Sequence, residues 1–403
     1  MNRSLVATRP HRSKQISDAV AGDPTIVDLT VGEPSYGPPG VVSDTLAALV
    51  AVRTDEPSVP HNHYAPGRGT TELRAAISAW YRRAYGLEVD PETEILVTHG
   101  AAEALWLSVF TLTEPGDEVL MPDPCYMLYE PITTALGRVP VRVPTVPGDG
   151  FALDPEQVER AVTARTRALL VNSPANPTGT VLEPETVARL VELAAERGFH
   201  VVHDEVFDCL VYEGEHVPAI AVPGGREHAL VANSFSKRFG ITGWRLGWLA
   251  GPAAVLAEAA KAHTLMTLAV ARLPQVAVAA ALAEPAIEEE VTRNCRRLRE
   301  RGRRFLDELL ALGFSCPGGA PRCGFYLFLR PDALADGDGS GETFAHYLLR
   351  EARIAVVPGR VFGPAGDAFV RFSYAGPQDA LDRALERLAE LPALVEARAA
   401  RAR

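Results

Sequence analysis

The sequence predicts an α/β fold, with a large domain built on a mostly parallel central sheet flanked by helices and a smaller α+β domain. The middle of the chain alternates apolar runs of strand length with helical stretches, as α/β layered domains do. The strand-like runs are continuously apolar, which indicates a parallel sheet covered on both faces. The 403 residues are 47% hydrophobic, which is enough for a sizeable core.

Six segments have the composition of buried strands. They are residues 94–100, 117–124, 167–174, 200–206, 229–236 and 245–251. Helical patterns at 101–113 and 184–198 lie between them. The second of these has Pro184 near its start and Gly198 at its end, the usual asymmetry of helix termini.

The chain changes character after about residue 285. A long helix rich in Arg and Glu over 284–313 leads to shorter strands near 324–331 and 369–375, and a terminal helical stretch over 378–399 follows. We therefore expect residues 45–290 to form the large domain, and residues 1–44 and 291–403 to form the small one. The Gly- and Asp-rich residues 332–342 are expected to be a surface loop.

Charge and composition exclude several classes of protein. A net charge of −11 without dense Lys/Arg runs argues against nucleic-acid partners. No apolar run approaches the roughly 20 residues that span a bilayer, and no signal-peptide core is present, so a soluble cytoplasmic protein is expected. The five scattered cysteines indicate neither a disulfide framework nor a metal site.

The segment Ser234 to Lys237, with Arg245 eight residues after the lysine, is the most informative stretch. A lysine amine can form a Schiff base with an aldehyde cofactor, while hydroxyl and guanidinium groups hold its phosphate. In isolation, a solvated lysine on a surface loop is the commoner explanation.

Other polar signals follow strands, where ligands bind in open α/β sheets. Residues 99–104 pass from strand to helix through small side chains, so that backbone N–H groups can approach an anion. Asn172 and Asn176 stand among prolines after a strand and can donate to a ring oxygen or a carboxylate. An ordinary turn explains each of these features equally well when it is taken alone.

Two charged residues lie in strongly apolar strands. Asp204 needs a cationic partner, for which a protonated pyridine nitrogen and a structural salt bridge are alternatives. Arg371 needs an anionic partner, which is either a substrate carboxylate or an internal Asp or Glu.

Taken together and in order, the motifs of this chain resemble the class I and II aminotransferases, pyridoxal-phosphate (PLP) enzymes of fold type I. The motifs are VGEP, NHYAPGRGTTELR, THGAAEAL, PDPCYMLYE, NSPANPTG, DEVF, SFSKRFGITGWRLGW and VRFSYA. They span roughly residues 25 to 375 and are individually modest but jointly specific. The resemblance implies transfer of an α-amino group from an amino acid to a 2-oxo acid.

The resemblance also implies roles in holding PLP. Lys237 would carry it as a Schiff base and move the Cα proton. Asp204 would pair with the pyridine nitrogen, Asn176 would donate to the phenolic oxygen, and Tyr126 would stack on the ring. The groups on the phosphate would be Ala101, Ala102, Ser234, Arg245 and, from a neighbouring subunit, Tyr64.

The same resemblance implies the binding of substrate and of a partner. Arg371 would bind the substrate α-carboxylate, assisted by Asn176 and the backbone near Gly32. A phosphate contact from the neighbouring subunit's Tyr64 implies a homodimer with shared active sites. Arg272 lies in a segment that in this family approaches the partner's site, and Arg360 is a candidate for the substrate pocket for which a structural role is the commoner explanation.

Phe207 departs from the family pattern, because a tyrosine that donates to the cofactor's phenolic oxygen usually stands there. Losing this donor is expected to raise the pKa of the Lys237 Schiff base. The departure keeps an alternative function open. The chain could be a PLP-dependent lyase or cyclase that catalyses elimination, replacement or ring closure on a basic amino acid, or it could be an amino-acid epimerase. A third hypothesis is a PLP-binding regulatory domain. We expect it less, because such proteins generally carry a DNA-binding segment and neither end of this sequence has the length or charge for one.

Overall fold

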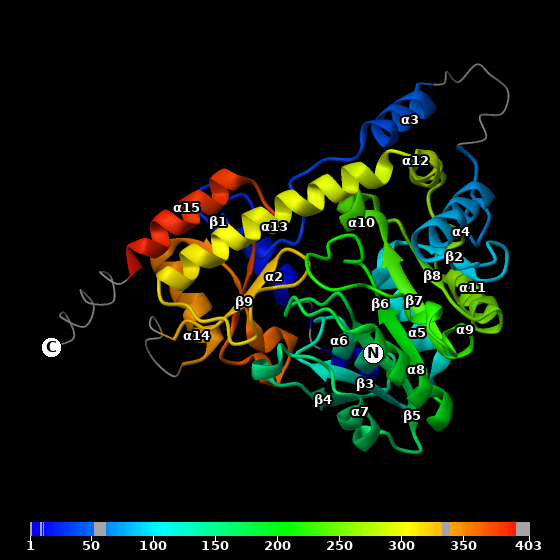
Figure 1. Cartoon of the computed structure of the whole chain (residues 1–403), viewed down its shortest axis with the longest axis horizontal. Helices are drawn as coiled ribbons and strands as arrows, with labels where there is room; N and C mark the ends of the chain where they lie inside the picture. Colours follow the sequence, from blue (N-terminus) through cyan, green and yellow to red (C-terminus); the bar gives the residue numbers. More distant parts are fainter. Residues whose placement is uncertain (1, 9, 11, 52–61, 333–338, 392–403) are drawn as a thin grey trace.

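The computed structural model describes residues 2–8, 10, 12–51, 62–332 and 339–391 (Figure 1). At its centre is a seven-stranded sheet with the order β2-β8-β7-β6-β5-β3-β4. The strands are β2 (Ile95–Thr98), β3 (Glu118–Asp123), β4 (Val139–Pro144), β5 (Thr166–Asn172), β6 (His200–Asp204), β7 (Ala229–Ser234) and β8 (Gly247–Ala250). Strand β8 runs antiparallel to both neighbours and the other pairings are parallel, which confirms the predicted α/β fold.

All six predicted strands are present, but two details of the prediction are wrong. Strand β4 was not predicted, because its sequence VPVRVP is half exposed and contains two prolines. Prolines are tolerated there since β4 is an edge strand that pairs only with β3. The last strand begins at Gly247 and not at Arg245, whose φ of 54° places it in a left-handed turn before the strand.

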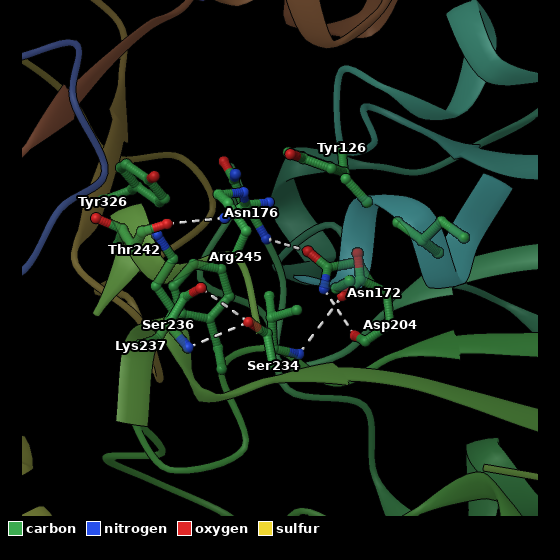
Figure 2. A pocket seen from close by; sticks show the side chains of 15 residues that line it. Tyr126, Asn172, Asn176, Asp204, Ser234, Ser236, Lys237, Thr242, Arg245 and Tyr326 are labelled. Carbon is green, nitrogen blue, oxygen red and sulfur yellow. Dashed lines mark hydrogen bonds between the residues drawn. The ribbon is translucent and has the colours of Figure 1, made fainter. Parts of the chain in front are cut away.

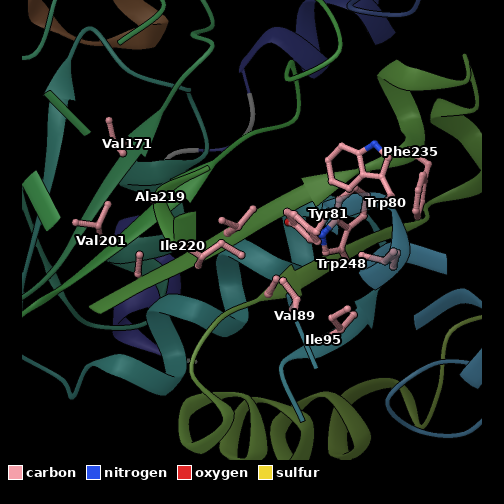
Figure 3. Close-up of a cluster of buried hydrophobic side chains, with 14 of the residues drawn as sticks. Trp80, Tyr81, Val89, Ile95, Val171, Val201, Ala219, Ile220, Phe235 and Trp248 are labelled. Atoms are coloured by element: carbon pink, nitrogen blue, oxygen red, sulfur yellow. The ribbon is translucent and has the colours of Figure 1, made fainter. Parts of the chain in front are cut away.

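Alternate residues of the strands face two layers of helices. Leu96 of β2 packs in a buried cluster with residues of α5 (Gly100–Leu112) and α11 (Ala253–Thr267). Its neighbours Ile95 and Val97 pack in a second cluster, with residues of α4 (Thr71–Tyr85), α8 (Pro184–Arg197) and α12 (Arg272–Ala283). Figure 3 shows the aromatic part of this second cluster, where Trp80 and Trp248 meet edge to face at 5.8 Å between ring centroids. Covering both faces explains why the strands are apolar at successive positions.

The predicted helices at 101–113 and 184–198 are confirmed as α5 and α8. Gly198 ends α8 with a φ of 75°, and its N–H bonds to the carbonyl of Ala194. A left-handed residue at this position favours glycine, which has no Cβ to clash.

A second group of elements comes from both ends of the chain. Strands β9 (Tyr326–Leu329), β11 (Val357–Pro358) and β12 (Val370–Ser373) form an antiparallel sheet, and β1 (Val27–Asp28) pairs with β10 (Ile354–Ala355) in parallel. Val27 and Leu29 share a buried cluster with Phe305, Leu327 and Phe372. Phe305 belongs to α13 (Ile287–Ala311), the predicted long helix, which runs across the molecule from α12 toward α15 (Gln378–Ala389) (Figure 1).

Shorter helices complete the architecture. They are α1 (Arg3–Ala7), α2 (Arg12–Val20), α3 (Gly40–Val50), α6 (Tyr129–Ala135), α7 (Pro155–Ala161), α9 (Gly225–His228), α10 (Phe235–Arg238) and α14 (Gly341–Tyr347). The loop predicted over 332–342 ends earlier than expected, since Ser340 caps α14 by accepting from the N–H of Thr343 at 3.2 Å. Residues 333–338 of that loop, and 392–399 of the predicted terminal helix, lie outside the described residues. Within the described ranges, none of the helices combines the length and apolar composition that crossing a membrane requires.

Candidate active site

A cavity of about 150 Å³ opens at the carboxyl ends of β5, β6 and β7, beside the start of α5 (Figure 2). This is the edge of an open α/β sheet at which ligands bind. The cavity is lined by Ala101, Ala102, Leu105, Tyr126, Asn172, Asn176, Asp204, Val206, Phe207, Ser234, Ser236, Lys237, Thr242, Arg245 and Tyr326. Residues from across more than 200 positions of the chain therefore meet at one site.

Lys237 lies on the short helix α10, directly after β7. Its Nζ donates to the carbonyl oxygen of Gly32, so the segment before α3 reaches the site through its backbone. Burial lowers the pKa of the Lys237 amine to about 8, and Arg245 and Arg371 act in the same direction against Glu33. A lowered pKa makes the neutral amine, the nucleophilic form, more abundant near neutral pH.

Asp204 ends β6 and is only 2% exposed. Its Oδ2 accepts from the hydroxyl of Tyr129 at 3.1 Å, and its Oδ1 accepts from the N–H of Val206 at 3.4 Å. Burial raises the pKa of Asp204 to about 7, and these two donors offset only part of the effect. Among the residues that the structure describes, no cation forms an ion pair with this carboxyl group.

Arg371 of β12 is also 2% exposed and reaches the site through Asn176. One guanidinium nitrogen donates to Asn176 Oδ1 at 3.0 Å and another donates to the carbonyl of Thr30 at 2.8 Å. The guanidinium stacks at 3.9 Å from the ring centroid of Tyr326 and at 5.0 Å from that of Phe362. No carboxylate pairs with Arg371 in the described part of the chain, so the internal Asp or Glu considered from the sequence is not found.

The start of α5 and Arg245 together form a cradle for an anion. A Cβ added at Gly100 would lie 2.7 Å from an Arg245 guanidinium nitrogen, and one at Gly247 would lie 2.9 Å from the N atom of Ala101. Glycine at position 100 therefore allows the guanidinium to approach the helix N-terminus, where free N–H groups favour negative charge, and glycine at position 247 allows the backbone of β8 to approach the same turn. Ser234 lies beside them and accepts from the N–H of Ser236 at 3.1 Å.

The remaining predicted residues are placed as follows. Tyr126 lines the cavity, and Phe207 does so while packing edge to face on Phe325 at 5.2 Å. Tyr64 is 81% exposed and does not line the cavity within this one chain. Arg272 donates to the carbonyl of Tyr64 at 2.7 Å.

Four residues at the site were not predicted: Leu105, Val206 and Thr242, which line the cavity, and Tyr129, which contacts Asp204. Tyr129 is buried, and its hydroxyl bonds to Asp204. The only available signal was its position in the motif PDPCYMLYE, three residues after Tyr126.

These groups fit PLP. A buried carboxyl with no cationic partner among the described residues suits a protonated pyridine nitrogen, and the cradle at Gly100 suits a phosphate. A lysine amine whose pKa is lowered toward neutrality suits attachment to an aldehyde.

Comparison with known proteins gives the same answer. Residues 24–388 match the family model described as aminotransferase class I and II. The chain is 34% identical over 382 residues to the putative aminotransferase YugH of Bacillus subtilis (strain 168), covering 94% of this chain and 95% of the relative. It is 38% identical over 370 residues to the aspartate/prephenate aminotransferase of Thermus thermophilus, covering 91% of each.

A solved structure, that of Thermus thermophilus aspartate aminotransferase with maleate, is similar with a TM-score of 0.89 at 35% identity, covering 97% of this chain and 99% of that one. These relatives are named as aminotransferases, so the comparisons do not favour the lyase, cyclase or epimerase alternative that Phe207 raised. The site and the comparisons together show that this chain belongs to the class I and II aminotransferases and is a PLP-dependent enzyme of that family.

Proposed function

We propose that the cavity at Lys237 is where this aminotransferase binds PLP and exchanges an α-amino group between an amino acid and a 2-oxo acid. The observation that carries the proposal is a pair of buried charged groups at one site, each without an opposite charge among the described residues. They are Asp204 and Arg371, and they are linked through Asn176 and Asn172. Leaving both uncompensated is costly unless ligands supply the missing charges.

The proposed cofactor contacts follow from these positions. Asp204 pairs with the pyridine nitrogen, Asn176 donates to the phenolic oxygen through its amide nitrogen, and Tyr126 stacks on the ring. The phosphate rests on the N–H groups of Ala101 and Ala102, with Ser234 and Arg245 beside them. Asn176 is well suited to its role, because its Oδ1 already accepts from Arg371 and its NH₂ group stays available for donation.

Arg371 and Lys237 divide the work on the substrate. Arg371 binds the α-carboxylate with its planar guanidinium, which Thr30, Asn176 and the Tyr326 ring hold in place. Lys237 accepts the Cα proton on Nζ and returns it, and a pKa near 8 suits a base that must work in both directions. Bound PLP supplies the aldehyde that takes up the amino group and a ring that accepts the electron pair left on Cα.

We expect half-reactions that can be observed separately. Adding an amino acid alone to the PLP-loaded enzyme should change the cofactor's absorbance and release one equivalent of 2-oxo acid, and adding a 2-oxo acid should reverse the change. Aspartate and prephenate, for which the Thermus thermophilus relative is named, are the first pair to test. Release of ammonia or of a cyclic product, without reversal, would contradict amino-group transfer and favour a lyase or cyclase.

The enzyme is proposed to be a cytoplasmic homodimer in which Tyr64 of each chain completes the other chain's phosphate site. In support, Tyr64 is almost fully exposed, and Leu265 (88% exposed), Met266 and Leu268 form an apolar surface near the end of α11. Such an exposed apolar group is typical of a surface that another chain covers. The division into a domain of residues 45–290 and one of residues 1–44 and 291–403 is likewise a proposal, supported by the buried cluster that joins both chain ends.

Mixing two inactive dimers tests the shared site. At limiting PLP, Lys237→Ala and Tyr64→Ala dimers are each expected to be weak, and subunit exchange should restore about a quarter of the wild-type activity, because one site in each mixed dimer has both residues. The recovered activity must depend on the exchange of subunits. In the control, each dimer is cross-linked before mixing, and no activity should be recovered. No gain after demonstrated exchange would show that Tyr64 serves its own chain or no site.

A further inference from the structure

Arg238 comes directly after the lysine of the active site but does not line the cavity, and its side chain is only 5% exposed. Both residues belong to α10, a helix of four residues, which is about one turn. So short a helix is not stable by itself, because its first turn fixes several residues for a single hydrogen bond. The position of Lys237 therefore depends on contacts from outside α10. Tyr36 provides one of them by donating to the carbonyl oxygen of Lys237, and Arg238 provides others.

Two carboxylates from different elements bind the guanidinium of Arg238. Its Nη1 donates to both oxygens of Glu288, at 2.9 and 2.8 Å, and its Nη2 lies 3.4 Å from Asp208 Oδ2. Asp208 lies in the turn after β6 with its side chain 1% exposed, whereas Glu288 lies in the first turn of α13 and is 47% exposed. The guanidinium also stacks over the ring of Trp80, 4.8 Å from its centroid. Arg238 thus ties α10 to α4, to α13 and to the turn after β6.

Asp208 extends this network to the end of β7. Its Oδ2 also accepts from Asn233 Nδ2 at 3.1 Å, and Asn233 Oδ1 accepts from the N–H of Ser234 at 2.6 Å. Ser234 is the residue that caps α10, by accepting from the N–H of Ser236. Arg238 is therefore connected, through two buried side chains, to the residue proposed to hold the phosphate.

Glu288 connects the network to the part of the molecule that holds Arg371. Helix α13 packs on the large sheet through Ile287 and runs on toward the small sheet (Figure 1). There Phe305 packs edge to face on Phe372 of β12, with 6.3 Å between the ring centroids, and Phe372 is the neighbour of Arg371. Helix α13 thus joins α10, which carries the proposed base, to the strand that carries the proposed carboxylate-binding arginine.

We propose that Arg238 is a positioning residue that fixes the helix carrying Lys237. By bridging the turn after β6 and the start of α13, it sets the distance between the Lys237 amine and a substrate held on Arg371. This assignment rests on the proposed function, in which Lys237 moves the Cα proton. A base must lie within hydrogen-bond reach of the proton that it takes, and a misplacement of about 1 Å can cost about 100-fold in rate. Arginine suits the task, because its planar fork of donors can bond to two carboxylates at once.

Rapid mixing of the PLP-loaded enzyme with an amino acid tests the effect on Lys237. For Arg238→Gln, the maximal rate of the cofactor's absorbance change should fall about 10- to 100-fold. The amino-acid concentration that gives half of this rate should change by less than about threefold, because Arg371 is untouched. Deuterium at Cα should slow the variant further, as expected where proton transfer limits the rate, and Arg238→Lys should recover part of the loss since it keeps the charge without the fork. An unchanged maximal rate, or a variant that deuterium does not slow, would overturn the role of Arg238.

Glu288→Gln is a second variant that should fold even if Arg238→Gln does not, because Glu288 is half exposed. It should slow the reaction less than Arg238→Gln does, and it should have no further effect when Arg238 is already replaced, since both changes remove one contact. Independent, additive losses would overturn the tie to α13. Arg226→Gln is the matched control, because Arg226 of α9 pairs with Glu94 at 2.6 Å and does not line the cavity. It should leave the rate unchanged.

A measurement without substrate separates this role from the proposed function. In the full-length protein without PLP, amide hydrogen exchange over residues 235–241 should be about tenfold faster in Arg238→Gln and in Glu288→Gln than in the wild type. In Arg226→Gln it should be unchanged. Wild-type exchange in both of the first two variants would overturn the role of Arg238. If exchange rises as expected but no amino acid changes the cofactor's absorbance in the wild type, the proposed function fails while Arg238 still fixes α10.

Discussion

Replacing Lys237 by alanine is expected to lower the turnover of amino acids by at least about 10³-fold and to abolish covalent attachment of PLP. The side chain carries the only amine that lines the cavity in the described structure, and its pKa of about 8 makes that amine both a nucleophile and a base. Removing it takes away both functions. The measurements are steady-state turnover and borohydride reduction followed by peptide mass spectrometry.

Lys261→Ala is the matched control for this experiment. Lys261 is exposed on α11, where it pairs with Glu258 at 2.6 Å. The Lys261→Ala variant should keep wild-type turnover, and borohydride reduction should still attach the cofactor to Lys237. Full activity in Lys237→Ala, or cofactor fixed at another residue, would contradict the assignment of the site.

Replacing Asp204 by asparagine is expected to have two opposite effects. Turnover should fall at least about 10²-fold, because the amide cannot supply the negative charge proposed for the pyridine nitrogen. The apoprotein should nevertheless become more stable at pH 8, since an uncharged amide replaces a buried carboxylate without a cationic partner. Tyr129 can donate to the amide oxygen as it does to the carboxyl group, so the replacement should keep that hydrogen bond and lose only the longer one, at 3.4 Å, from the Val206 N–H.

The sign of the pH dependence follows from the raised pKa. The folded apoprotein holds the Asp204 proton up to about pH 7, whereas the unfolded chain releases it near 3.8. The contribution of this group to stability is therefore fully present below pH 3.8 and is lost as the pH rises through about 7. A shift of this size corresponds to a loss on the order of 4 kcal/mol above pH 7.

Urea unfolding of both apoproteins at several pH values tests this dependence. The free energy of unfolding of the Asp204→Asn variant should exceed that of the wild type, and the difference should be small near pH 4 and grow up to about pH 7. Asp379→Asn, at an exposed aspartate on α15 that pairs with Arg383, should show no such growth. A variant that is less stable than wild type at pH 8 would mean that the Asp204 carboxylate is compensated by a group other than PLP.

The arrangement of the large sheet was predictable because buried parallel strands have a strong sequence signature. Strands β5, β6 and β7 are largely apolar at successive positions, and each ends in a polar residue: Asn172, Asp204 or Ser234. Parallel strands present their carboxyl ends at one edge, so these residues were expected to meet. Strand β4 was not predicted because its half-exposed sequence lacks an apolar run, and it becomes a strand through its pairing with β3.

The electrostatic state of the site was not predictable in the same way. An apolar strand around Arg371 or Asp204 indicates burial, but it does not say which charges the fold brings near them. The alternative of internal salt bridges remained open until the surrounding elements were placed. The same holds for Arg245, whose guanidinium approaches the start of α5 because Gly100, far away in the sequence, has no Cβ there.

The sequence by itself determined the fold class, the family and the identity of Lys237, Asp204, Asn176, Arg245 and Arg371 as the residues to examine. These conclusions follow from local composition and from the order of the motifs, both of which can be read directly from the sequence. The tertiary structure alone decided that Asp204 and Arg371 have no opposite charge in the described chain and that Tyr129 supports Asp204. Whether a charge is compensated depends on distances between segments far apart in sequence, and only the packing of the folded chain sets those distances.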